Sequence, residues 1–385
     1  MHSKKTRACV FTSRGMAAIS SIALAGPDAQ GILDKVFQEG CAEAWSGSDT
    51  INSTFHGSII DGERVVDEVV VGCESENEFA IHCHGNPLLV EQIVKLLQSH
   101  GAALMDAEHF AIQRCQRESK NAIEVEAKLA MQKSATLLGV KILQSQIDDG
   151  LSKWARETLD AADSLCVDDI QKGCEQILRH SKIARRIIEG VRIVIAGPPN
   201  SGKSTLLNCL VGTKQVIVSN TAGTTRDWVS ATGQVGPIRA EFIDTAGLDD
   251  ALAGADAIEE NAQQITKELL SACDAVLYVV SVLGPQSSAP SDYGRPVVCV
   301  YNKCDLFQEN KDTRIQEPGA VFVSAKYNEG IDVLAGEIMA ALGVDGFDVA
   351  APVAFTQRQR EMISAVAAAP AHARELLPEL IDGSS

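Results

Sequence analysis

Residues 191–205, VRIVIAGPPNSGKST, decide the fold of this chain. They begin with an apolar, β-branched run of strand length, break at Gly197, and resume at Ser204 as STLLNCL, which is typical of the start of a helix. Between the two lies Gly197-x-x-x-x-Gly202-Lys203-Ser204, the phosphate-binding loop pattern in the strand-to-helix context that it requires. Glycines let several backbone N–H groups point at one anion, and the helix N-terminus adds partial positive charge. The stretch therefore predicts a nucleotide-phosphate site.

The side chains of this loop have separate expected roles. Lys203 can reach the β- and γ-phosphates, and the Ser204 hydroxyl can ligate Mg²⁺. The alternative, a glycine-rich turn before a surface helix, is disfavoured by the strand and the helix on either side. The loop residues expected to hold the nucleotide are Gly197, Asn200, Ser201, Gly202, Lys203, Ser204 and Thr205.

A second polar motif follows the next apolar stretch. RAEFIDTA (239–246) reads as a half-buried strand that ends in Asp244-Thr245-Ala246-Gly247. Asp244 is expected to hold Mg²⁺ through water, and the N–H of Gly247 is expected to meet the γ-phosphate.

Two later strands predict which base is bound. VVCVYNKCD (297–305) is a buried strand that runs into an N-K-x-D pattern, which resembles the guanine-reading motif of GTPases. A carboxylate there accepts hydrogen bonds from guanine N1 and its 2-amino group, which adenine cannot supply, so ATP is rejected. AVFVSAK (320–326) gives another strand and the loop that closes on the base. The residues expected to surround guanine are Asn302, Lys303, Asp305, Ser324, Ala325 and Lys326.

The acidic composition argues against non-specific binding of nucleic acid or anionic membrane. The 385 residues predict two or three domains, and 34 basic against 51 acidic residues give a net charge of −17. Such a chain is a poor non-specific binder of nucleic acid or anionic membrane, so an RNA partner would need a local basic patch. The sequence offers two weak candidates, Lys182-x-x-Arg185-Arg186 and Arg358-x-Arg360.

Cysteine usage and hydropathy predict a cytoplasmic protein with no membrane association. The eleven cysteines show no C-x-x-C spacing, which favours reduced thiols over a disulfide set. His82-Cys83-His84 resembles a metal site, but no further ligand is apparent in the sequence. Residues 16–26, MAAISSIALAG, follow basic residues as in a signal peptide, yet they are short and read better as a core strand. No run of 18 apolar residues predicts a membrane span.

The remaining pattern predicts three kinds of domain. Residues 1–115 read as a small α/β domain, 116–188 as helices, 189–347 as the GTPase domain, and 348–385 as the second part of the helical domain. The expected elements of the first domain are strands at 17–24, 65–71 and 78–84 and helices at 27–38 and 87–100. The predicted fold class is thus an α/β P-loop GTPase domain inserted in an α-helical domain and preceded by a small α/β domain.

This order of parts resembles the MnmE (TrmE) family of tRNA-modification GTPases. The resemblance covers nearly the whole chain and is carried by RGMAAISSIALAGPDA, HGSIIDGERVVDEVVV, AIHCHGN, VSNTAGTTRDWV and FTQRQREMI. It implies a hydrolysis cycle that drives modification of the tRNA wobble uridine. It also implies a homodimer formed through the N-terminal domain, GTP-dependent pairing of GTPase domains, and tRNA and an FAD-dependent MnmG-type protein as partners.

The chain also departs from the family pattern. It stops at LPELIDGSS without the family's terminal C-x-G-K motif, and CESENEF and DAEHFAIQRCQRESK replace two motifs of the N-terminal domain. Ala23 stands where the family carries an arginine. Those segments shape the family's pocket for formyl-tetrahydrofolate, so weak or absent folate binding is expected. The open alternative is a GTP-gated switch or assembly factor that has lost the tRNA chemistry.

The resemblance also implies how GTP is hydrolysed. Leu248 occupies the place where Ras-like proteins carry a water-positioning glutamine. The family uses a potassium ion instead, and the implied ligands are Asn200 and the switch-loop residues Ala222 and Thr224. Thr225 or Thr224 would ligate Mg²⁺, and Glu259 would orient the water. A solvated helix-face carboxylate is the open alternative for Glu259. The implied catalytic residues are Lys203, Thr225, Gly247 and Glu259.

Overall fold

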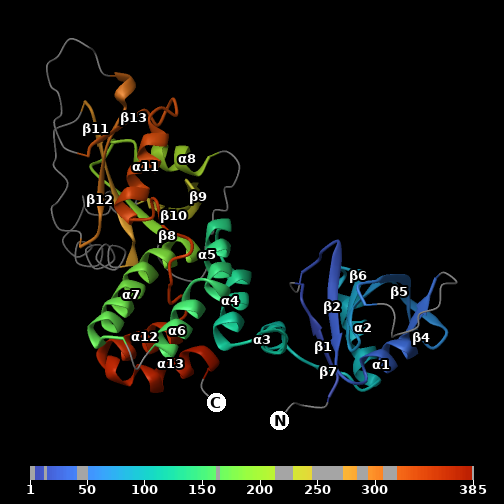
Figure 1. The fold of residues 1–385 in the computed structure, drawn as a ribbon. Helices are drawn as coiled ribbons and strands as arrows, with labels where there is room; N and C mark the ends of the chain where they lie inside the picture. Colours follow the sequence, from blue (N-terminus) through green and yellow to red (C-terminus); the bar gives the residue numbers. More distant parts are fainter. Residues whose placement is uncertain are drawn as a thin grey trace, which may run out of the picture. The chain divides into compact units, whose positions relative to one another are not determined.

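The computed structural model describes residues 5–12, 15–40, 51–161, 165–212, 229–244, 272–283, 294–306 and 319–383. The chain divides into two compact units, Met1–Glu118 and Ser119–Ser385 (Figure 1). Among the helices in these ranges, none combines the length and the apolar character that crossing a membrane would need. The expected switch residues Ala222, Thr224, Thr225, Gly247 and Glu259 lie outside the described residues, as does Leu248.

The first unit is built on a mainly antiparallel sheet of seven strands. Its order is β3-β4-β5-β6-β2-β1-β7, and only the β1–β7 pair is parallel. The strands are β1 (Arg7–Val10), β2 (Ile19–Ala25), β3 (Phe37–Glu39), β4 (Thr54–Asp61), β5 (Arg64–Ser75), β6 (Glu78–His84) and β7 (Ala103–Leu104). Alternate residues of β2, β5 and β6 point into one core, because side chains alternate between the faces of a strand.

Three helices accompany this sheet. Helices α1 (Ala29–Val36) and α2 (Pro87–Ser99) pack on the face that holds the main core. On the opposite face, Phe110 of α3 (Ala107–Glu118) packs against Cys9, Ala23 and Ala25. The helix expected over 27–38 ends at Val36, because Phe37 leaves helical geometry and pairs with β4. The strands expected at 17–24 and 65–71 are shifted to 19–25 and extended to 64–75.

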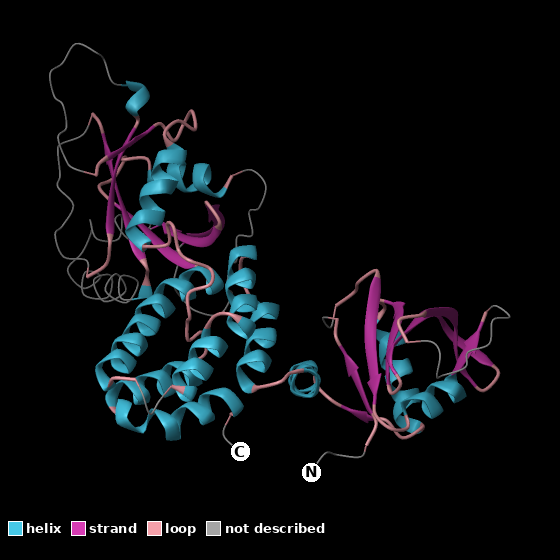
Figure 2. Ribbon diagram, viewed as in Figure 1, coloured by secondary structure: helices cyan, strands magenta, loops and turns pink. Residues whose placement is uncertain are grey.

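The second unit contains a group of helices from two distant stretches of sequence. They are α4 (Ala122–Lys133), α5 (Leu137–Asp148), α6 (Leu151–Asp160), α7 (Val167–Glu189), α12 (Gln357–Ala368) and α13 (Ala373–Asp382), and Figure 2 shows them together below the sheet of the same unit. Ile123, Leu151 and Cys174 share one buried cluster with Ile363 and Leu377. Burial of these apolar side chains against one another is the main force that joins the two stretches.

Polar contacts tie the same two stretches. The buried Gln146 accepts hydrogen bonds from the N–H groups of Leu151 and Val353 at 2.9 and 3.0 Å. Arg358 pairs with Glu126 at 2.6 Å and also donates to the carbonyls of Glu379 and Leu380. Arg358, one of the two basic candidates for an RNA patch, is therefore used inside the helical part.

The rest of the second unit is a six-stranded sheet. Its order is β13-β12-β11-β8-β10-β9, and every neighbouring pair is parallel except β10–β9. The strands are β8 (Val191–Ala196), β9 (Val229–Val235), β10 (Ile238–Asp244), β11 (Ala275–Ser281), β12 (Val297–Asn302) and β13 (Val321–Val323). Helices α8 (Lys203–Val211) and α11 (Ile331–Leu342) contribute Leu206 and Leu334 to the core beneath it. Parallel strands bring their carboxyl ends to one edge, where ligands bind in open α/β sheets.

Candidate functional site

The phosphate-loop residues follow the carboxyl end of β8 at this edge. Gly197 has φ of +140°, and a Cβ added there would lie 2.0 Å from the carbonyl oxygen of Val279 on β11. Only glycine fits so close to the neighbouring strand. Asn200 also lies at positive φ, +61°, and Gly202 is the N-cap of α8. The loop is thus held by its neighbours in a curled conformation whose end opens into a helix N-terminus.

Lys203 and the first turn of α8 lie directly behind the loop. Lys203 is 5% exposed, and its ammonium donates to the carbonyls of Gly197 at 2.7 Å and Pro198 at 3.2 Å. These contacts hold the ammonium beside the loop where phosphate oxygens would bind. Ser204 and Thr205 are exposed in the first turn of the helix.

The two described residues expected to hold Mg²⁺ meet. The hydroxyl of Ser204 donates to the carboxylate of Asp244 at 2.7 Å. Parallel pairing of β10 with β8 sets Asp244 opposite Ile195, one residue before the end of β8. A hydroxyl and a carboxylate are hard oxygen ligands, so this donor pair fits Mg²⁺.

Asn302 joins three loops at the same edge. It is 2% exposed, and its amide N–H donates to the carbonyl of Ser201 at 3.0 Å. Its amide oxygen accepts from the backbone N–H of Lys303 at 2.8 Å and of Ala325 at 3.1 Å. Lys303 extends over the phosphate loop, where its ammonium donates to the carbonyl of Asn200 at 2.5 Å. Asn302 therefore positions the expected base site against the phosphate loop.

The expected base-reading carboxylate is oriented by the next loop. The hydroxyl of the buried Ser324 donates to one oxygen of Asp305 at 2.6 Å. Asp305 itself is exposed, which leaves the other side of its carboxylate accessible to a ligand. Lys326 is also exposed, and its ammonium lies 4.9 Å from the centre of the Tyr327 ring. A hydrogen bond with Tyr327 raises the pKa of Lys326, which keeps the ammonium charged.

Sequence reasoning missed the contacts that assemble this edge. The contacts of Asn302 with Ser201 and of Lys303 with Asn200 join residues about a hundred positions apart. No local pattern signals such pairs, because each depends on how β8 and β12 are placed in the sheet. The positions themselves carried a signal, since each follows the end of an apolar strand.

The N-terminal unit brings together a different set of polar groups. His84 lies 2.7 Å from the buried Asp67, and His82 hydrogen-bonds Ser21 at 2.9 Å. Among the described residues, no group of three or more His, Cys, Asp or Glu side chains is placed to hold a metal ion. Ala23 is 4% exposed and pairs with Cys9 and Ala80 on the neighbouring strands. The side chain at position 23 is thus an uncharged methyl group.

Fold and motifs together define a P-loop GTPase domain. The family model described as 50S ribosome-binding GTPase matches residues 192–303. Curated proteins named tRNA modification GTPase MnmE are similar along most of this chain, as three of them illustrate. The Bacteroides thetaiotaomicron protein is 26% identical over 85% of this chain and 80% of its own length. The Endomicrobium trichonymphae protein is 28% identical over 88% and 82%, and the Heliobacterium modesticaldum protein 28% over 99% and 91%.

Similarity of this extent covers the helical and N-terminal parts as well as the GTPase domain. The chain is a divergent relative of the MnmE GTPases and a GTP-hydrolysing enzyme. Among solved structures, the G domain of the T. maritima FeoB iron transporter is 22% identical, with 39% of this chain and 98% of that chain covered and a TM-score of 0.31.

Proposed function

We propose that this protein is an MnmE-type GTPase whose cycle of GTP binding and hydrolysis serves modification of the tRNA wobble uridine. The observation that carries the proposal is the convergence of Lys203, Ser204, Asp244, Asn302 and Asp305 at one edge of a parallel sheet. The likeness to MnmE proteins over 85–99% of the chain supports the tRNA part.

The phosphate loop and the residues beside it are proposed to bind the phosphates of GTP and Mg²⁺. The curled loop from Gly197 to Gly202 directs its N–H groups at the phosphates, and Lys203 places its ammonium against the β- and γ-phosphates. Ser204 and Asp244 would hold Mg²⁺, which neutralises charge on the β- and γ-oxygens. Thr205, in the first turn of α8, would also contact the nucleotide.

Guanine is read by the neighbouring loops. Asp305 accepts hydrogen bonds from guanine N1–H and the 2-amino group, and Ser324 fixes the carboxylate for this role. Asn302 holds the loops, while Lys303, Ala325 and Lys326 line the base and sugar side. Adenine would leave the carboxylate unpaired, so ATP is rejected.

Hydrolysis depends on further residues, which lie outside the described ranges except Asn200. Thr225 would close on the metal, Gly247 would donate its N–H to the γ-phosphate, and Glu259 would orient the attacking water. Asn200, with backbone oxygens of Ala222 and Thr224, would hold K⁺, which adds the positive charge that an arginine finger supplies elsewhere. Pairing of two GTPase domains would complete this arrangement.

We further propose that the chain consists of an N-terminal domain, a helical domain in two parts and a GTPase domain between those parts. The GTPase domain, residues 189–347, interrupts a helical domain formed by 116–188 and 348–385, and residues 1–115 form the N-terminal domain. The buried cluster that Ile123 and Cys174 share with Ile363 and Leu377 supports this division. The N-terminal domain would form a homodimer, and an FAD-dependent MnmG-type protein would act with it on tRNA.

A second candidate function is favoured by one observation. Ala23 is a buried alanine between two strands, so the N-terminal unit lacks the cation that the family resemblance placed there for formyl-tetrahydrofolate. A GTP-gated switch or assembly factor without tRNA chemistry accounts for this replacement.

Deletion of the gene separates the two functions. We expect mass analysis of tRNA from the deletion strain to show loss of the wobble-uridine modification, restored by the parent gene but not by Lys203→Ala. A fully modified tRNA pool in the deletion strain would discard the tRNA function and leave the switch.

A further inference from the structure

Five arginines line one hollow at the edge of the GTPase sheet opposite to the phosphate loop. The hollow has a volume of about 820 Å³ and lies where β8 and β10 begin and just before β11 and β12. We call it the arginine hollow. Its arginines come from α7, β8, β10 and the segment before β12, and they are Arg185, Arg186, Arg192, Arg239 and Arg295. Its carboxylates are Glu189, Glu241 and Asp274.

The end of α7 brings these segments together. Helix α7 stops at Gly190, which has φ of +87°, and the chain turns directly into β8. A Cβ added at Gly190 would lie 2.9 Å from the carbonyl oxygen of Arg239. Glycine therefore allows the last turn of α7, with Arg185 and Arg186, to lie against the start of β10.

The carboxylates of the arginine hollow do not balance its arginines. Asp274 accepts a hydrogen bond from the N–H of Arg192 at 3.1 Å and lies 3.5 Å from Arg186 and 4.0 Å from Arg185. Glu241 pairs with Arg192 at 2.9 Å. Arg239 is exposed at the rim. Among the described residues that line the hollow, five are arginines and three carry carboxylates, a difference of two positive charges.

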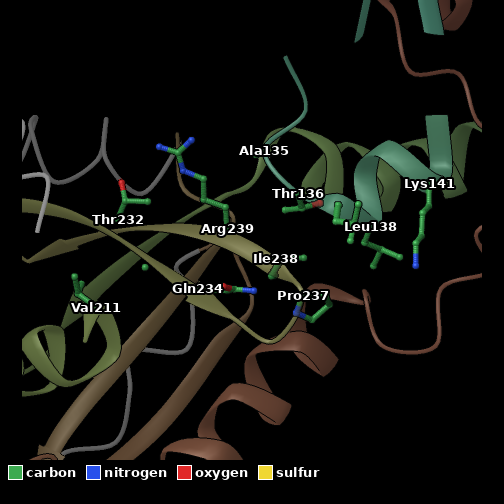
Figure 3. Close-up of a pocket in the computed structure, with 12 residues that line it drawn as sticks. Ala135, Thr136, Leu138, Lys141, Val211, Thr232, Gln234, Pro237, Ile238 and Arg239 are labelled. Carbon is green, nitrogen blue, oxygen red and sulfur yellow. The ribbon is translucent and has the colours of Figure 1, made fainter. Parts of the chain in front are cut away.

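An adjoining hollow extends this surface. It has a volume of about 780 Å³ and shares Thr232 and Arg239 with the arginine hollow. Figure 3 shows Thr136 and Ile238 between Arg239 and Lys141, which both line it. No acidic side chain is among the described residues that line it. In the part of the chain that the structure describes, the linings of the two hollows together contain Lys141, five arginines and three carboxylates, whereas the net charge of the chain is −17.

We propose that the arginine hollow and its extension to Lys141 bind the phosphate backbone of an RNA. This inference rests on the proposed tRNA function and names the surface that would hold the tRNA. Guanidinium groups recognise phosphate by paired hydrogen bonds, and a local basic surface on an acidic chain directs a polyanion to one place. An acidic protein partner is less favoured, because aromatic anchors are typical of protein interfaces and no aromatic side chain is among the described residues lining either hollow.

The position of the surface allows a clean test. A strand of six residues such as β8 spans about 20 Å, so substitutions in the arginine hollow lie far from the phosphate loop. The test compares the full chain with Arg185→Ala/Arg239→Ala and with Lys172→Ala/Arg179→Ala. The control removes the same charge from two exposed positions earlier on α7.

Binding of unmodified tRNA is measured at several salt concentrations, and GTP affinity is measured in parallel. For the hollow variant we expect a loss of about tenfold per arginine at 0.1 M salt and a salt slope lower by about two. The control variant should bind tRNA as the parent does, and all three proteins should bind GTP equally. If the double variant loses GTP binding, the single exposed change Arg239→Gln replaces it, with half the change in slope.

The outcomes separate this inference from the proposed function. Equal tRNA affinity and slope in parent and hollow variant would overturn the hollow alone. A parent protein that binds no tRNA would overturn both. Loss of binding to poly-glutamate with tRNA binding unchanged would show that the surface takes an acidic polypeptide instead.

Discussion

The two sheets of this protein differ in how they gather polar groups. The parallel strands β8, β10 and β12 end at one edge, and a polar motif follows each of them, so Lys203, Asp244 and Asn302 lie within one site. In the antiparallel sheet, neighbouring strands run in opposite directions, so the residues after each strand lie at opposite edges. Its polar contacts instead form across a face, as between Ser21 and His82. In a parallel sheet, polar residues that follow several strands meet at one edge, so short sequence motifs can predict the site. On a face of an antiparallel sheet, the polar contacts involve single residues at alternating positions, which form no motif.

The largest effect is expected at the edge of the parallel sheet, where loss of the Lys203 ammonium should slow GTP hydrolysis. Lys203→Ala removes the cation beside the loop carbonyls, so we expect GTP hydrolysis to fall roughly hundred- to thousandfold. Single-turnover hydrolysis measures the change, with Lys182→Ala, an exposed lysine of α7, as the control. Parent-like hydrolysis by Lys203→Ala would mean that the parallel edge is not the GTPase site.

A change of base preference is the next largest effect expected. Asp305→Asn exchanges an acceptor for a donor where Ser324 holds the side chain. We expect GTP affinity to fall about a hundredfold and affinity for xanthosine triphosphate to rise. Calorimetry with both nucleotides checks this.

Asp345→Asn, an exposed change outside the site, is the matched control. Equal ATP and GTP affinity in the parent protein would contradict the guanine-reading role of Asp305.

The dependence of hydrolysis on potassium tests the role of Asn200 separately from the roles of the other residues at this edge. If Asn200 supplies an oxygen to K⁺, hydrolysis should be faster in KCl than in NaCl and should rise with protein concentration. Loss of one charge-stabilising contact costs on the order of 3 kcal/mol, roughly a hundredfold in rate at most. Asn200→Ala should therefore lose most of the potassium response while it still binds GTP.

The measurement is the hydrolysis rate at equal ionic strength in the two salts. Identical rates in both, with no dimer on addition of GDP and aluminium fluoride, would contradict the potassium mechanism.

The smallest signal is expected from the antiparallel sheet. With Ala23 buried between Cys9 and Ala80, we expect weak or absent binding of formyl-tetrahydrofolate in a calorimetric titration. A low-micromolar dissociation constant would show that other residues have rebuilt the pocket, and it would favour the tRNA function over the switch.

The sequence alone determined the class of the nucleotide domain. Strand length, glycine spacing and the polar residues after each apolar run are local properties, so Gly197, Lys203, Asp244 and Asp305 could be predicted as site residues without a structure. The strand at 78–84 and the helix starting at Pro87 were predicted for the same reason. Element ends were predicted less well, as at Phe37, where pairing with β4 replaced the last helical residues.

Only the tertiary structure decided which distant side chains meet. Asn302 binds the carbonyl of Ser201 because β12 and β8 flank β11, and Arg185 lies near Asp274 because α7 ends against the sheet. The two basic candidates in the sequence looked alike. Tertiary packing places them in different surroundings. Arg358 pairs with Glu126 inside the helical part. Arg185 and Arg186 instead line a hollow together with three arginines from other segments. Long-range pairing energies depend on the whole fold, and no local pattern contains them.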